Sequence, residues 1–247
     1  MKKVISFSLW GNSPKYTKGA IENAVLASKI FPDWICRFYI GLSTIQQAPT
    51  IVETLRSFNN VEIVVMSEEG DWTGMFWRFA PCSDPDVEYM LSRDCDSRLS
   101  IREKAAVDDW IRSGKNFHII RDHPLHLYKI LGGLWGAKRP LLKNIDELMA
   151  DYSKKNYWNI DQEFLGDIVF PMVRNEALVH DEFLGLRSIP MPRPGDEFLG
   201  EIFDDNNEPD STQRALLRNE IMRINRFPLR FRRVLAKNWR RLKGNLS

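Results

Sequence analysis

Short apolar runs at residues 4–9, 35–40 and 61–66 alternate with amphipathic segments at about 16–30 and 50–58. Apolar runs of this length predict buried strands, and the segments between them have the periodicity of helices. The order strand, helix, strand, helix, strand predicts a mainly parallel, Rossmann-like sheet with right-handed crossovers and helices on its faces. A chain of 247 residues is long enough for one such α/β domain.

The loop after the first predicted strand differs from the common nucleotide-binding motifs. Its sequence over residues 9–16, Leu-Trp-Gly-Asn-Ser-Pro-Lys-Tyr, has neither the glycine pattern of dinucleotide-binding folds nor a Walker loop. A nucleoside at this edge of the sheet must therefore be held in another way. Trp10 and Tyr16 are candidates to stack on a base, and Lys15 is a candidate to bind a phosphate. Each of these side chains fits the core or the surface equally well.

An apolar run at residues 87–91 is followed by two aspartates, Asp94 and Asp96, which are one residue apart and therefore point the same way. Open α/β sheets bind ligands at the carboxyl ends of their strands, and two carboxylates there suit a divalent cation that carries a diphosphate. An Asp-x-Asp tripeptide is also frequent by chance. The alternative is a solvated strand-to-helix turn in which Asp or Ser caps the next helix.

Three segments of the chain together resemble one enzyme family. Residues 93–98, Arg-Asp-Cys-Asp-Ser-Arg, are similar to the metal-binding motif of GT-A glycosyltransferases. Residues 130–136, Ile-Leu-Gly-Gly-Leu-Trp-Gly, and 161–165, Asp-Gln-Glu-Phe-Leu, resemble segments of members that build bacterial surface polysaccharides. The resemblance covers residues 1 to about 205. It implies a GT-A-like α/β fold and sugar transfer from a nucleotide-diphosphate sugar, with Mn²⁺ or Mg²⁺ as cofactor.

The resemblance also implies which residues hold the metal and the donor. The two aspartates would bind the metal, and His180, at the end of a predicted short strand, would be the third ligand, as in many metal-dependent members. Three arginines are candidates to bind the donor's diphosphate: Arg78, Arg93 and Arg98. As alternatives, Arg78 forms a salt bridge with a nearby aspartate, and Arg98 pairs with Glu103 in the next helix.

Acceptor-binding and catalytic residues are expected near the same edge of the sheet. A predicted strand ends just before Asp122 and His123, and paired glycines beside an indole allow a sugar to approach the backbone. Four residues are therefore candidates to bind the acceptor: Asp122, His123, Gly133 and Trp135. Asp161 and Gln162 begin a predicted helix, where a carboxylate can act as general base or stabilise developing positive charge. The alternatives are ordinary turns at the first two places and a helix N-cap at Asp161.

The net charge of +2 is unevenly distributed along the chain. Residues 214–243 hold eleven Lys or Arg and one acid, a local charge of +10, which leaves −8 on the remainder. Apolar residues recur there at steps of three and four and are interrupted by Pro228, as in two short amphipathic helices. We therefore predict a domain at 1–210 and a basic helical tail at 211–247 that binds an anionic membrane surface. The alternative is that the apolar stripe docks on the acidic domain.

Composition predicts a cytoplasmic protein, peripheral on the inner face of the cytoplasmic membrane. Three cysteines without metal-ligand spacing favour reduced thiols. No apolar run approaches the ~20 residues that span a bilayer. A nucleic-acid partner is not expected, because paired carboxylates rather than basic groups mark the ligand edge of the sheet.

The sequence thus predicts a metal-dependent glycosyltransferase with a glycan or lipid-linked acceptor, acting in surface polysaccharide or lipopolysaccharide synthesis. Two alternatives remain open. A sugar nucleotidyltransferase would share the fold and the metal, but it would need a glycine-rich loop with Arg and Lys after the first strand. A non-catalytic nucleotide- or glycan-binding module would not need the paired carboxylates.

Overall fold

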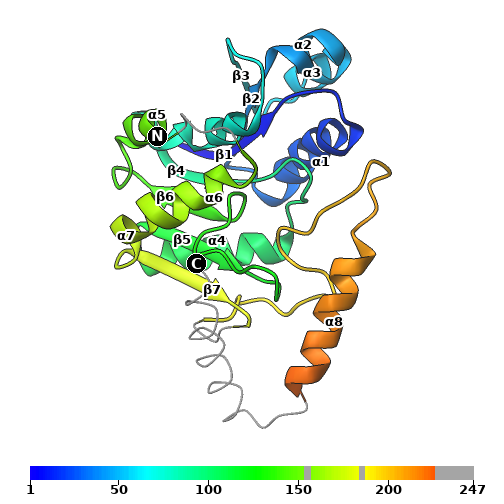
Figure 1. Ribbon diagram of the computed structural model, residues 1–247, viewed down its shortest axis with the longest axis vertical. Coiled ribbons are helices and arrows are strands. Elements are labelled where there is room, and N and C mark those ends of the chain that lie inside the picture. Colours follow the sequence, from blue (N-terminus) through cyan, green and yellow to red (C-terminus); the bar gives the residue numbers. More distant parts are fainter. Residues whose placement is uncertain (153–156, 184–186, 226–247) are drawn as a thin grey trace.

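The computed structural model describes residues 1–152, 157–183 and 187–225. Within these residues the centre of the fold is a seven-stranded sheet with the order β3-β2-β1-β4-β6-β5-β7 (Figure 1). β6 is antiparallel to both of its neighbours, and all other neighbouring strands are parallel. The predicted α/β architecture is therefore confirmed. The strands are β1 (Lys2–Leu9), β2 (Ile35–Ile40), β3 (Val61–Val65), β4 (Val87–Ser92), β5 (Phe117–Arg121), β6 (Trp135–Lys138) and β7 (Ala177–Asp181).

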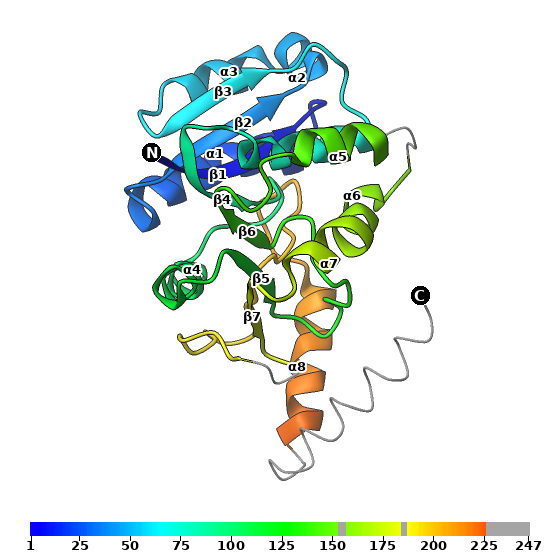
Figure 2. The ribbon, with the colours of Figure 1, turned by 90° about the vertical axis from the view of Figure 1, so that its left-hand side faces the viewer.

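Helices cover both faces of the sheet (Figure 2). Phe7 of β1 and Trp110 belong to the apolar core beneath α1, α3 and α4, whereas Val4 and Phe164 belong to the core beneath η1, α5, α6 and α7. Successive residues of β1 therefore supply opposite cores, as the two-residue period of a strand requires. The helical elements are α1 (Pro14–Ile30), α2 (Leu42–Gln47), α3 (Pro49–Arg56), the 3-10 segment η1 (Trp72–Cys82), α4 (Ile101–Ser113), α5 (Ile145–Tyr152), α6 (Ile160–Phe164), the π-helical turn η2 (Leu165–Val169), α7 (Phe170–Val173) and α8 (Ser211–Asn225).

Local sequence fixes the helix that follows the two aspartates. Ser100 Oγ accepts a hydrogen bond of 3.1 Å from the backbone N of Glu103, and Gly114 ends α4 with φ 71°. The loop between β4 and α4 is thus held by regular structure at both of its ends.

All three cysteines are buried free thiols. Burial raises the pKa of Cys36 to about 12 and raises the pKa of both Cys82 and Cys95. The thiols therefore stay protonated at neutral pH, when a cysteine is a poor nucleophile and a poor metal ligand.

The first part of the predicted tail packs on the domain. Leu217 of α8 is buried, Arg214 forms a salt bridge with Glu201, and His123 Nε2 donates to the carbonyl O of Gln213 at 2.9 Å. For residues 211–225 these contacts favour the docking alternative. The predicted second helix beyond Pro228 lies outside the described residues. Among the helices that the structure describes, none is both long and apolar enough to cross a membrane.

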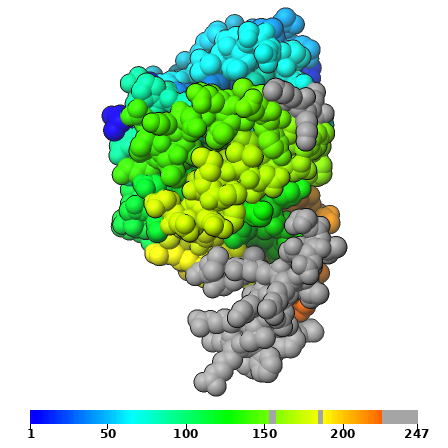
Figure 3. Space-filling model, turned by 60° about the vertical axis from the view of Figure 1, so that its left-hand side comes forward, coloured from blue at the N-terminus to red at the C-terminus, as the bar shows by residue number. Residues whose placement is uncertain are grey.

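Figure 3 shows how the chain is distributed over one face of the molecule. Residues from the first third of the sequence form one end of this face, and residues from the middle of the sequence form most of the adjoining surface. The two parts meet along the sheet, where β1 pairs with β4.

Candidate active site

The connection from β1 to α1 and the connection from β4 to α4 lie beside each other at the carboxyl edge of the sheet. From β1 the chain proceeds to β2 and β3 on one side, whereas β4 lies on the other side, so the strand order reverses between β1 and β4. Open α/β sheets bind ligands outside the strand ends at such a reversal. Lys15 follows β1 in the first turn of α1, and Asp94 and Asp96 follow β4. The fold therefore brings these predicted site residues to one place.

Lys15 and Asp96 form an ion pair across this reversal. Lys15 Nζ lies 2.7 Å from Asp96 Oδ2 and 5.1 Å from the ring centre of Tyr16. Burial raises the pKa of Asp96, the charge of Asp94 adds to the rise, and Lys15 opposes it. Burial and the charge of Asp96 likewise raise the pKa of Tyr16. We call Lys15, Tyr16, Asp94 and Asp96 the donor side of the site, after the metal- and donor-binding roles that the sequence predicts for them.

Arg78 connects the donor side to the beginning of α6. Its two terminal nitrogens lie 2.6 Å from Asp94 Oδ1 and 2.6 Å from Asp161 Oδ2. Burial opposes the charge of Arg78, but the two carboxylates outweigh it and raise the pKa of the guanidinium. Arg78 thus binds Asp94 and Asp161, whereas Asp84, one of the aspartates near it in the sequence, pairs with Arg37 instead. The buried Nε of Arg78 has no partner among the described residues.

Asp161 is a buried carboxylate in the first turn of α6, and it is not the N-cap of that helix. The N-cap is Asn159, whose φ of 69° is left-handed. Burial raises the pKa of Asp161, against the opposing charge of Arg78 and a hydrogen bond from the backbone of Gln162. The carboxylate is thus both shielded from water and paired with the guanidinium of Arg78. Groups in such surroundings are common at functional sites.

Paired glycines form a backbone wall beside these carboxylates. A Cβ atom at Gly132 would lie 2.3 Å from Asp161 Oδ2, and one at Gly133 would lie 1.9 Å from Asp94 Oδ2. Only glycine permits so close an approach of backbone to carboxylate. Ser92 Oγ donates to the carbonyl O of Gly132 at 2.7 Å and holds the wall in position. The sequence points to Gly132 only through its place in the glycine pair. The pair was expected to let a sugar approach the backbone, and in the structure it lets the side chains of Asp161 and Asp94 do so.

The carboxylates of the donor side suit a divalent cation that arrives with a phosphate. In the described parts of the chain, no group of three His, Cys, Asp or Glu side chains is arranged to hold a metal ion. Mg²⁺ is commonly held by one or two carboxylates together with substrate phosphates. Asp94 and Asp96 supply that number, and 41% of the Asp94 side chain is exposed. Such an ion would replace Lys15 as the partner of Asp96.

His180 does not lie with the two aspartates, contrary to the expectation of a third metal ligand. Its Nδ1 is 2.8 Å from His118 Nε2, and its Nε2 is 3.0 Å from Asp109 Oδ2. Both ring nitrogens therefore have protein partners, and the side chain is buried. β6 and β5 separate β7, which carries His180, from β4 in the sheet. The histidine is a core residue that joins β7 to β5 and α4.

Two of the three candidate arginines, Arg93 and Arg98, stabilise the loop after β4 by contacts within the protein, and the one atom of Arg93 without a partner among the described residues, Nη2, is buried. Arg93 is buried, pairs with Glu103 and donates to two backbone carbonyls. Arg98 donates to the carbonyl O of Cys95 at 3.1 Å and to Asn207 Oδ1 at 2.7 Å. The alternative pairing of Arg98 with Glu103 is therefore wrong, because Arg93 takes that place. Sequence order cannot distinguish two arginines that are five residues apart.

Asp122 and His123 are structural residues, contrary to the prediction that they bind an acceptor. Asp122 is fully buried and pairs with Arg102 and Arg193. The ring nitrogens of His123 bond to the carbonyl O of Gln213 and the backbone N of Leu125. Both side chains bind neighbouring segments of the chain, and a buried carboxylate with two guanidinium partners has little capacity for another ligand.

Trp135 is also inside the protein, whereas the adjacent glycine pair lies at the site. Trp135 begins β6 and is fully buried, with its ring stacked on Phe117 at a centroid distance of 5.3 Å. The predicted sugar platform therefore has no accessible face at this residue. Gly133 remains beside Asp94, as described above.

Trp10, in the loop after β1, packs against the segment that contains Gly70 and Trp77. A Cβ atom at Gly70 would lie 2.0 Å from Trp10 Cγ, and the Trp10 ring meets Trp77 edge-on at 6.0 Å between centroids. The indole thus packs against glycine backbone, which leaves little of this face for a base. Its packing positions the segment that leads into η1, the element that carries Arg78.

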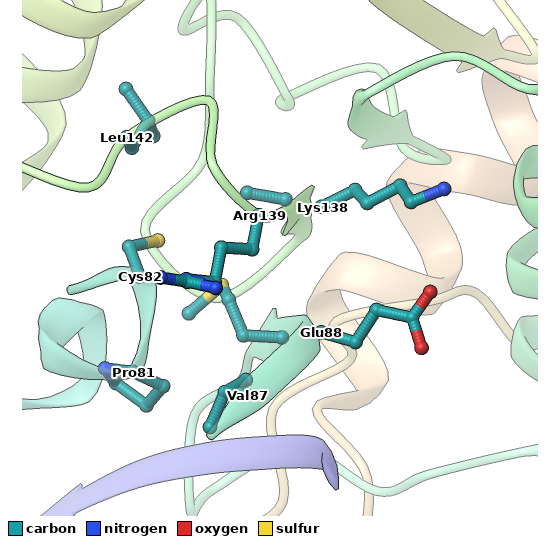
Figure 4. A pocket seen from close by; sticks show the side chains of 9 residues that line it. Pro81, Cys82, Val87, Glu88, Lys138, Arg139 and Leu142 are labelled. Atoms are coloured by element: carbon teal, nitrogen blue, oxygen red, sulfur yellow. The ribbon is translucent and has the colours of Figure 1, made fainter. Parts of the chain in front are cut away.

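The pocket in Figure 4 lies near the opposite end of β4. Nine residues line it, among them Cys82, Val87 and Lys138, and it holds about 10 Å³. That volume fits about one water molecule. A nucleotide cannot bind there, so the pocket is unrelated to the candidate site.

No protein-family model matches the sequence, and no curated protein matches it. Several solved structures resemble the fold. TarS residues 1–349 from S. aureus gives a TM-score of 0.52 at 17% identity, over 74% of this chain and 58% of that one. The same fragment in complex with UDP-GlcNAc gives 0.50 at 17% identity, over 74% and 56%. This chain therefore spans little more than half of that fragment.

Two further structures are similar at lower scores. A glycosyltransferase involved in glycosylation of the major capsid of PBCV-1 gives a TM-score of 0.49 at 16% identity, over 74% of this chain and 82% of that one. The 4-diphosphocytidyl-2C-methyl-D-erythritol synthase from Anaerococcus prevotii gives 0.48 at 11% identity, over 73% and 87%. The two TarS comparisons, at 17% identity, show the fold alone, and that fold is a GT-A-like α/β architecture.

Proposed function

We propose that the protein is a glycosyltransferase with a nucleotide-diphosphate sugar as its donor. One observation carries the proposal. Arg78 joins Asp94 of the donor side to the buried Asp161, with 2.6 Å at each contact. A cation-binding carboxylate pair and a separate carboxylate suited to proton transfer are thus held beside each other, as transfer to a hydroxyl requires. The GT-A-like fold and the complex of TarS 1–349 with UDP-GlcNAc support a donor of this class.

In the proposed reaction each part of the site has a distinct role. Asp94 and Asp96 would hold Mn²⁺ or Mg²⁺, and the ion would supply positive charge to the leaving diphosphate. Lys15 would exchange Asp96 for a phosphate oxygen, and Tyr16 beside it would border the nucleoside. Asp161 would take the proton of the acceptor hydroxyl in an inverting reaction or stabilise positive charge in a retaining one. Gln162 would orient the acceptor beside it.

A donor screen tests this proposal against the two alternatives. UDP-, GDP-, CMP- and dTDP-sugars with Mn²⁺ should be screened for slow release of the nucleotide, which needs no acceptor. A nucleotidyltransferase would instead release pyrophosphate from a nucleoside triphosphate and a sugar phosphate, and the single Lys15 in place of a glycine-rich basic loop argues against that reaction. Binding of a donor without turnover would favour a non-catalytic module.

Removing Arg78 should shift the pH dependence of donor turnover. Arg78 lowers the pKa of Asp161, which burial raises. In Arg78→Met that pKa should rise further, so the carboxylate becomes protonated at a higher pH, and turnover should begin to fall at a higher pH as the solution is acidified. Breaking a buried pair should also cost about 3–5 kcal/mol of stability. The pH-rate profile and the melting temperature measure the two effects.

Arg37→Met provides the matched control for this prediction. Arg37 is also a buried arginine with two carboxylate partners, Glu62 and Asp84, but it lies on β2. This variant should lose stability, but the pH at which turnover falls on acidification should stay the same. If that pH shifts equally in the two variants, the fall in turnover reflects general destabilisation and not protonation of Asp161.

We also propose that the protein acts in surface polysaccharide synthesis at an anionic membrane surface. The role in polysaccharide synthesis rests on the resemblance of residues 130–136 and 161–165 to that family. The membrane location rests on residues 226–243, which hold eight Lys or Arg and no acid. Each basic residue near an anionic leaflet contributes about 1 kcal/mol.

Two truncations should separate the tail's two parts. A chain that ends after residue 225 should fold, hydrolyse donor and lose co-sedimentation with anionic vesicles. A chain that ends after residue 210 should melt at a lower temperature, because it loses the buried Leu217 and the pair of Arg214 with Glu201. Full-length protein with neutral vesicles is the control. Undiminished binding by the 1–225 chain would place the lipid contact elsewhere.

A further inference from the structure

Two exposed aromatic side chains lie beside the start of α6. The exposed fraction is 68% for Trp158 and 39% for Tyr128. They belong to different loops, and the loops are joined because Asn159 Nδ2 donates to Tyr128 Oη at 3.0 Å. In Figure 2 the loop after β5, which carries Tyr128, lies on the same side of the sheet as α6 and α7. We call Tyr128, Trp158 and Asn159 the aromatic ledge.

The ledge is held in a fixed relation to Asp161. The left-handed φ of 69° at Asn159 turns the chain into α6, and Asn159 is not glycine, so the conformation is strained. Its side-chain Oδ1 accepts from Gln162 Nε2 at 2.9 Å, and its backbone O accepts from the backbone N of Gln162 at 3.0 Å. Trp158 therefore stands three residues before the buried carboxylate, on a loop that several hydrogen bonds stabilise.

The chemistry of the ledge fits a sugar ring better than a phosphate. An indole presents an apolar face to the C–H groups of a pyranose, and the Tyr128 hydroxyl, which accepts from Asn159, keeps a hydrogen to donate. The neighbouring cationic side chains, Arg121 and Lys129, already bind groups of the protein. Arg121 donates to Asp181 at 2.7 Å and to the carbonyl O of Lys129 at 2.9 Å, and Lys129 Nζ lies 3.4 Å from the carbonyl O of Gly166.

We propose that the aromatic ledge binds a pyranose ring of the acceptor and presents one of its hydroxyls to Asp161. The inference rests on the proposed glycosyltransferase function and names the substrate class and the residues on the acceptor side. It places the sugar platform at Trp158, because Trp135 is buried in the sheet. Trp158 supplies the stacking face, Tyr128 a polar contact at its edge, and Asn159 fixes the position of both.

Transfer to simple acceptors tests the ledge. Methyl pyranosides of glucose, galactose, mannose and N-acetylglucosamine serve as probes, with the donor found by the screen. Trp158→Ala should raise the KM for the accepted pyranoside about tenfold, as loss of an aromatic contact predicts. Trp158→Phe, which keeps an aromatic face, should remain within about threefold of the wild type. Donor hydrolysis without acceptor should be unchanged in both variants, because Trp158 does not belong to the donor side.

Ile101→Ala is the matched control, since Ile101 is 65% exposed and begins α4 on the opposite face of the sheet (Figure 2). Its KM for the pyranoside should equal that of the wild type. Tyr128→Phe keeps the ring and removes the hydroxyl, so a rise of KM smaller than that of Trp158→Ala is expected. Equal effects of Trp158→Ala and Ile101→Ala would overturn the proposal, as would a loss of donor hydrolysis that parallels the change in KM.

Direct binding separates failure of this inference from failure of the proposed function. Saturation-transfer NMR with the same methyl pyranosides requires no turnover, so it applies even if no donor is hydrolysed. The wild type should transfer saturation to ring C–H groups, and Trp158→Ala should lose most of it. Glycerol phosphate serves as the contrasting probe. If it binds in the wild type and no pyranoside does, the ledge is not a sugar site.

Discussion

Asp96→Asn should abolish sugar transfer and leave the protein folded. The change removes one carboxylate charge at the point where the strand order reverses and keeps the size of the side chain. Loss of one preorganised charge contact at a reacting group lowers turnover by at least about a hundredfold. Asp96 is buried, and burial and the neighbouring Asp94 both oppose its charge, so the neutral Asn should leave the melting temperature close to that of the wild type. Turnover at saturating donor and thermal melting are the measurements.

Chelation should have the same effect on the unaltered protein. EDTA should stop transfer, and added Mn²⁺ should restore it. Asp108→Asn is the matched control for Asp96→Asn, because Asp108 is a partly exposed aspartate that pairs with Lys104 on α4. That variant should transfer at the rate of the wild type. Undiminished transfer in excess chelator would contradict the metal, and Lys15 and Arg78 would then neutralise the diphosphate unaided.

Asp161→Asn should lower kcat by at least about a hundredfold with little change in the KM for the donor, the behaviour of a group that moves a proton in the transition state. Asn keeps the shape of the side chain, and Arg78 retains Asp94 as a partner. The donor side should therefore bind normally. Steady-state kinetics with donor and acceptor varied separately measure the two constants.

Asp167→Asn is the control for this second substitution, since Asp167 is an exposed acid in η2, the helical turn that follows α6. It should leave kcat unchanged. A lower melting temperature for Asp161→Asn, with normal turnover per folded molecule, would make Asp161 a structural partner of Arg78 and nothing more.

The strands near the amino terminus were predictable because each is a compact apolar run. The strand predicted at 35–40 is β2 with the same bounds, and the run at 87–91 is β4 extended by Ser92. β6 was not predictable, since its four residues, Trp135–Lys138, include a glycine and a lysine and follow a glycine pair. Only pairing with β4 and β5 makes this segment a strand, and pairing depends on residues distant in sequence.

Dependence on residues distant in sequence also explains why some predictions for the candidate site were correct and others were wrong. Asp94, Asp96 and Lys15 follow strands that the apolar pattern locates, so their meeting at one edge could be inferred. Asp122 and His123 also follow a strand, but Arg102, Arg193 and Gln213, which occupy them, come from α4 and from the chain beyond β7. Whether a polar residue at a strand end faces a ligand or a protein partner depends on such distant segments.

The buried thiols make the protein suitable for site-directed labelling. Because Cys36, Cys82 and Cys95 are buried and stay protonated, a maleimide dye should leave all three unmodified in the folded chain. A cysteine introduced at an exposed position, such as Leu127→Cys beside Tyr128, would then react alone. A fluorophore attached there would report occupancy of the neighbouring surface by a change in emission, without removal of any native cysteine.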